Sequence, residues 1–130
     1  IVVLVNADYG DAAPRLASAL QRLLLDPVTA QDQARTRQDQ QVLLALQAAQ
    51  VDRDLFTANA NGFFSERVLT QTARALQAAG ALKRLSLRSR SSLGGLDERR
   101  YAAEFERQRY TLVTRAGADG RLEQFTLSRD

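Results

Sequence analysis

The apolar residues of this chain follow three patterns, and each pattern predicts a different kind of element. Residues 1–5 form an unbroken apolar run, mostly β-branched, which is typical of a strand buried on both faces. Leucines then recur at helical spacing over residues 16–24, before Asp26-Pro27 ends the helix. No second run like residues 1–5 occurs in the chain. We therefore expect residues 1–25 to be the last strand and helix of a domain whose other strands lie outside this chain.

The middle of the chain is expected to be helical. Residues 26–41 are polar, rich in glutamine and free of glycine, so they form either a connection or the start of a long helix. The apolar face of that helix would extend to about Gln50. A short helix capped by Thr57 and stopped near Gly62 follows, and Ser65 caps a longer one. The apolar face of the longer helix consists of Val68, Leu69, Thr72, Ala73, Leu76 and Ala79.

From Leu82 onward the apolar period changes to two, which predicts half-buried strands. Turns are expected at residues 91–95 and 116–120, so that four strands form an antiparallel meander. Helices followed by such a meander are an α+β order. The fold class that we predict is α+β, with the helices packed on a curved, cone-like sheet over residues 42–130.

Two resemblances to known protein families add to these predictions. The stretch from Ile1 to Asp8, with Gly10-Asp11 and the leucines that follow, resembles the C-terminal end of serine β-lactamase/penicillin-binding-protein-like hydrolases. In that family a final apolar strand leads into a helix that packs on the sheet. The resemblance covers about the first 25 residues. The family's catalytic motifs, Ser-x-x-Lys, Tyr-x-Asn and Lys/His-x-Gly, do not occur in this chain, so no catalytic residue is carried over.

The second resemblance lies in the predicted α+β domain. Residues 52–65 and 118–125 resemble the nuclear-transport-factor-2-like accessory domains that follow the hydrolase domain in some bacterial serine hydrolases. The resemblance implies a cone-shaped fold. The usual sheet of that fold is larger than the four strands predicted here, so the cone would be incomplete or closed by a second chain. The resemblance also implies the parent's catalytic domain as a partner. It also implies a periplasmic or exported location in a bacterium. It implies no activity for the accessory domain itself.

The composition limits the kinds of catalytic and metal-binding site that the chain can form. Histidine and cysteine are both absent, which removes the commonest general base, the commonest metal ligand and all thiolate chemistry. An acid–base pair would have to combine Asp52 or Asp54 with Tyr101 or Tyr110, and the alternative is that both aspartates cap helices or lie in solvent. We expect no catalytic residue, metal site or cofactor in this chain.

Aromatic residues are the remaining candidates for a site. They could line a hydrophobic cavity in the cone or fill it as core. The candidates are Phe56, Phe63, Phe64, Tyr101, Phe105, Tyr110 and Phe125.

The charge of the chain raises one more possibility. The net charge is +3, and it is concentrated in residues 83–130. Basic residues there alternate with acids, and aromatics are too sparse for a stacking platform, which disfavours nucleic-acid binding.

No apolar window is long enough to span a membrane. A homodimer through Ile1–Val5 or a sheet edge is a further expectation.

Three functions therefore stand at this point. The first is a non-catalytic accessory domain of a serine hydrolase, with a packing or modulating role. The second is a small-molecule-binding or isomerase-like cone domain with an aromatic cavity. The third is a basic nucleic-acid-binding module.

Overall fold

The computed structural model describes residues 30–130, so the strand and helix expected for residues 1–25 lie outside the described range. Thr36–Asp130 form one compact unit, and the packing described below is that of this unit. Within residues 30–130, no helix is long and apolar enough to cross a membrane.

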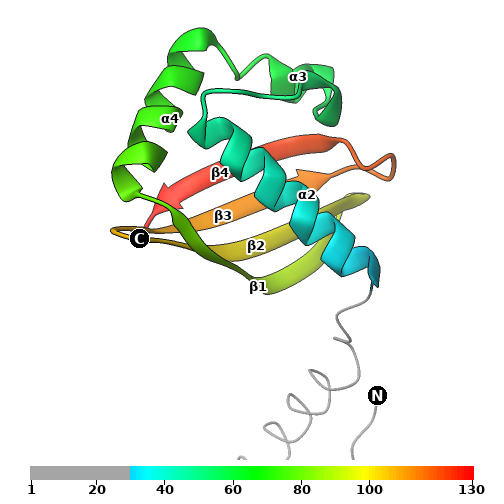
Figure 1. Ribbon diagram of the computed structural model, residues 1–130. Coiled ribbons are helices and arrows are strands. Elements are labelled where there is room, and N and C mark those ends of the chain that lie inside the picture. The colour runs from blue at the N-terminus through cyan, green and yellow to red at the C-terminus, as the bar shows by residue number, and fades with distance from the viewer. Residues whose placement is uncertain (1–29) are drawn as a thin grey trace, which may run out of the picture. The chain divides into compact units, whose positions relative to one another are not determined.

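The described part of the chain is a helical half followed by a sheet (Figure 1). The helices are α2 (Ala30–Gln47), α3 (Ala58–Asn61) and α4 (Glu66–Ala79), with a 3-10 turn, η1 (Arg53–Leu55), after α2. The strands are β1 (Leu82–Leu93), β2 (Leu96–Phe105), β3 (Arg109–Ala116) and β4 (Leu122–Arg129). They form one antiparallel sheet in the order β1-β2-β3-β4. The α+β class is confirmed, and among residues 30–130 the sheet is open, with β1 and β4 as its two edges.

The helix boundaries follow the capping residues. The Thr57 side chain accepts a hydrogen bond from the Ala60 backbone N–H at 3.2 Å, and this fixes the start of α3. The Ser65 hydroxyl accepts from the Val68 N–H at 3.3 Å at the start of α4. The polar stretch is helical from Ala30 onward, and it continues directly into the apolar half of α2.

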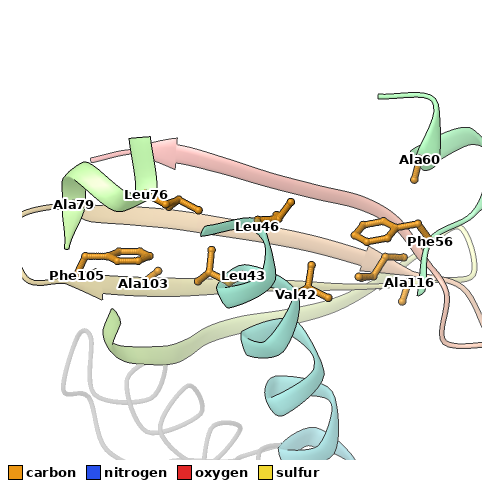
Figure 2. Close-up of a cluster of buried hydrophobic side chains, with 11 residues drawn as sticks. Val42, Leu43, Leu46, Phe56, Ala60, Leu76, Ala79, Ala103, Phe105 and Ala116 are labelled. Atoms are coloured by element: carbon orange, nitrogen blue, oxygen red, sulfur yellow. The ribbon is translucent and has the colours of Figure 1, made fainter. Parts of the chain in front are cut away.

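The core lies between α2, the other helices and one face of the sheet. Residues three and four apart share a helix face, so Val42, Leu43 and Leu46 all point from α2 toward the strands. Figure 2 shows Leu43 and Val42 between Ala103 and Ala116, with Leu76 of α4 next to Leu46. Further members of the cluster are Phe56, Ala60, Ala79, Phe105 and Leu122.

Two local expectations are corrected. The turn between β1 and β2 contains only Gly94 and Gly95, whereas residues 91–93 belong to β1. Both glycines have positive φ, 59° and 78°, which a two-residue hairpin loop requires, so the strands pair up to the loop. Val68 was expected on the buried face of α4 and is exposed instead, because the first turn of α4 borders a groove.

Candidate functional site

An open groove of about 560 Å³ lies between α3, the first half of α4 and the edge strand β4. The segment before α3 is joined to β4 by a bond from the Thr57 N–H to the Leu122 carbonyl at 3.0 Å, which fixes one end of the groove. The groove is lined by Leu46, Asn59, Ala60, Phe63, Phe64, Val68, Thr72, Leu96, Arg115 and Glu123–Leu127.

The walls of the groove are largely apolar. Phe63 is 71% exposed and Val68 is 37% exposed, so both present apolar surface to water beside the groove. Phe64 and Phe125 each pack edge-on against the buried ring of Phe56, with ring centroids 4.8 and 6.4 Å apart. Exposed apolar side chains that gather along one recess are typical of a contact surface.

Glu123, one of the two charged groups in the lining, already has structural partners. It accepts hydrogen bonds from Asn59 Nδ2 and Thr57 Oγ1, both at 2.7 Å. These bonds favour the ionised form and lower the pKa of the Glu123 carboxyl. The carboxylate therefore ties α3 to β4 and is held in the charged state.

Arg115, the other charged group, is also engaged. Its Nε donates to Glu98 Oε2 at 2.7 Å across the β2–β3 pair. The bond from Arg115 lowers the pKa of the Glu98 carboxyl. The groove therefore offers apolar contact, and its two charged groups serve the scaffold.

A second feature is a buried polar cluster between α2 and the sheet. Asp39 of α2 accepts hydrogen bonds on Oδ2 from the Tyr101 hydroxyl at 2.8 Å and from the Thr114 hydroxyl at 3.0 Å. All three side chains are fully shielded from water. Burial, and then the negative charge of Asp39, raise the pKa of the Tyr101 hydroxyl above its usual range. The cluster therefore fastens α2 to β2 and β3 with a neutral tyrosine.

The seven aromatic candidates do not share one cavity. Phe63, Phe64 and Phe125 line the groove. The remaining four belong to the core or pack against it: Phe56, Tyr101, Phe105 and Tyr110, the last with its ring 5.7 Å from that of Phe105.

The two aspartates considered for acid–base chemistry lie at a turn in contact with solvent. Asp52 caps η1 by accepting from the Asp54 N–H at 3.1 Å, and both aspartates are exposed. Among residues 30–130, no group of three or more His, Cys, Asp or Glu side chains could hold a metal ion.

Asp39 was missed at the sequence level, although a signal was present. It lies three residues before Val42 and four before Leu43, so it shares their buried helix face. An acidic residue on the buried face of a helix must have hydrogen-bond partners, because an unpaired buried charge is very costly. The polar surroundings of residues 26–41 obscured this signal.

No protein-family model matches this chain, and no curated protein or solved structure matches it either.

Proposed function

We propose that the described domain is a non-catalytic accessory domain of a serine β-lactamase-like hydrolase, and that it acts by contact through the groove. The observation that carries this proposal is the combination of exposed apolar walls with charged groups that are already engaged. Phe63 and Val68 favour a partner that covers them, while Glu123 and Arg115 are held by scaffold bonds. A general acid or base needs a group that can exchange a proton with a substrate, and the engaged pair does not offer one.

The parentage is supported by the resemblances of residues 1–25 and 52–65, and the periplasmic or exported location is proposed on the same basis. The partner proposed for the domain is accordingly the catalytic domain of the parent hydrolase. The reading frame upstream of Ile1 provides the test. Codons for Ser-x-x-Lys and Tyr-x-Asn in that frame are expected, and a frame without them would overturn the parentage.

The non-catalytic role has a separate test. The 130-residue chain would be incubated with a chromogenic cephalosporin and with a nitrophenyl ester. We expect the rates of hydrolysis to equal those in buffer, because the chain carries none of the family's catalytic motifs. Turnover that scales with the concentration of the chain would overturn the assignment.

A second candidate function, small-molecule binding, is favoured by the size of the groove. Its volume of about 560 Å³ lies within the range of about 300–1,000 Å³ found for ligand pockets. The measurement is thermal denaturation with a series of straight-chain fatty acids. For this candidate, stabilisation should increase with chain length and be lost in Phe63→Ser. Leu93→Ser is the matched control, since Leu93 is similarly exposed, at 68%, but lies outside the groove lining.

A further inference from the structure

The two edges of the sheet differ in charge. The edge strand β1 carries Lys83, Arg84, Arg88 and Arg90, and charges of this kind discourage another strand from pairing. The edge strand β4 has no charge over residues 124–128, between Glu123 and Arg129. One edge is therefore protected against strand addition, and the other is not.

Within residues 30–130, the backbone groups of β4 on its open side have no strand partner. A hydrogen bond from the Asp130 N–H to the Arg109 carbonyl, at 3.2 Å, makes these two residues a hydrogen-bonded pair of the β3–β4 ladder. Because hydrogen-bonded and non-hydrogen-bonded pairs alternate, Phe125 and Leu127 occupy non-hydrogen-bonded pairs with β3. Their N–H and C=O groups therefore point to the open edge. Among the described hydrogen bonds, the one from Thr57 covers that edge only at Leu122.

The exposed apolar side chains lie beside the same edge. Phe63 and Val68 line the groove together with Phe125 and Leu127, so a strand that pairs with β4 would also cover them. The groove and the open edge are therefore one surface, which we call the β4 surface (Phe63, Val68 and residues 124–129).

We propose that the β4 surface joins two copies of this chain through antiparallel β4–β4 pairing about a two-fold axis at Thr126. This inference rests on the proposed contact role of the groove and names a second copy of the chain as its occupant there, so the catalytic domain of the hydrolase would contact another face of the domain. The strand is complementary to itself in that register. Phe125 lies opposite Leu127 of the partner subunit, and Glu123 lies opposite Arg129 of the partner subunit. A parallel arrangement in register would instead bring like charges together, which is unfavourable.

The same register also provides hydrogen-bond partners for the outward-facing backbone groups of β4. Phe125 and Leu127 are the residues whose backbone groups face outward, and the two-fold axis at Thr126 pairs them with each other. The two Thr126 residues then form a non-hydrogen-bonded pair, in which side chains approach most closely. Thr126 is exposed in the single chain, so a charge introduced there leaves the fold intact and acts on the interface.

The test is the mass of the chain in solution, measured by sedimentation velocity over a wide concentration range. We expect the unsubstituted chain to reach twice its monomer mass. Thr126→Lys and Thr126→Glu should each weaken self-association by about fivefold or more, because two like charges meet at the axis. An equimolar mixture of the two variants should restore the dimer, since opposite charges then meet. Ser91→Lys, an exposed change on the edge strand β1, is the matched control and should dimerise like the parent.

A chain that stays monomeric at every concentration overturns the inference, including one that is stabilised by an added peptide or fatty acid. A dimer that both Thr126 variants retain is held by another surface and overturns it as well. These results are separable from failure of the proposed function. A monomeric chain without hydrolytic turnover leaves the accessory role in place, whereas turnover removes that role in any oligomeric state.

Discussion

Replacing Tyr101 with phenylalanine removes one hydroxyl from the buried cluster and preserves the ring. That hydroxyl donates to Asp39 at 2.8 Å, and both side chains are 0% exposed. A hydrogen bond to a carboxylate contributes about 1.5–3 kcal/mol, more than one between neutral groups. Asp39 keeps its bond from the Thr114 hydroxyl. We therefore expect Tyr101→Phe to lower the free energy of unfolding by about 2 kcal/mol.

The assay is urea denaturation followed by far-UV circular dichroism, since the chain has no tryptophan. The control is a double-mutant cycle with Asp39→Ala. Without the carboxylate the tyrosine hydroxyl has lost this acceptor, so Tyr101→Phe should cost at most about 0.5 kcal/mol in that background. Equal costs of Tyr101→Phe in the two backgrounds would refute the bond as a source of stability.

The same residue makes a pH prediction with a definite sign. Burial and the charge of Asp39 raise the pKa of Tyr101 in the folded state, whereas an unfolded tyrosine ionises near pH ~10. Above that pH, unfolding is therefore accompanied by release of the Tyr101 proton. The contribution of the neutral tyrosine is complete below about pH 10 and is lost as the pH rises toward the raised folded pKa. Tyr101→Phe should show a flatter loss of stability above about pH 10 than the parent chain, and parallel profiles would contradict the shift.

Three further predictions concern single residues of the described domain and can be tested by denaturation. Gly80→Ala should cost about 1–3 kcal/mol, because φ is +89° and a Cβ would lie 2.6 Å from a carboxylate oxygen; Gly94→Asn, at φ +59° in open space, should be nearly neutral. Phe56→Ala should cost about 3–5 kcal/mol and Phe125→Ala about 2–3, since Phe125 is only partly buried, and equal losses would contradict this difference. Glu123→Gln should lower the melting temperature at neutral pH. It should also reduce the loss of stability on acidification through about pH 4, since the lowered pKa of Glu123 stabilises the fold only above that range.

Elements set by local chemistry were predictable from the sequence. Thr57 and Ser65 cap their helices through bonds to backbone groups three residues away, and the period-two pattern placed the four strands. The partners of Asp39 were not predictable, because Tyr101 and Thr114 are 62 and 75 residues distant in the chain. Such pairs depend on how α2 crosses the sheet, and no local pattern encodes that crossing.

The groove was only half predictable, for a related reason. Aromatic residues at helical or strand spacing show that a face is apolar, but the spacing is the same whether the face is covered or open. Phe56 and Phe63 illustrate the point, since they are seven residues apart and are 2% and 71% exposed. The difference arises because, within residues 30–130, β4 is an edge strand and no further element covers Phe63 beyond it.

The way in which the inner face of the sheet is filled bears on where this domain can interact. Leu43 and Leu46 of α2 are almost fully buried against the strands, and the Tyr101 hydroxyl is bonded to Asp39. Protein interiors packed in this way have few voids larger than a water molecule. A ligand or partner that entered beneath α2 would have to displace both the leucines and the buried polar bonds. The groove requires no such displacement, because its apolar walls are already exposed. The packing under α2 therefore favours interaction at the β4 edge of the sheet.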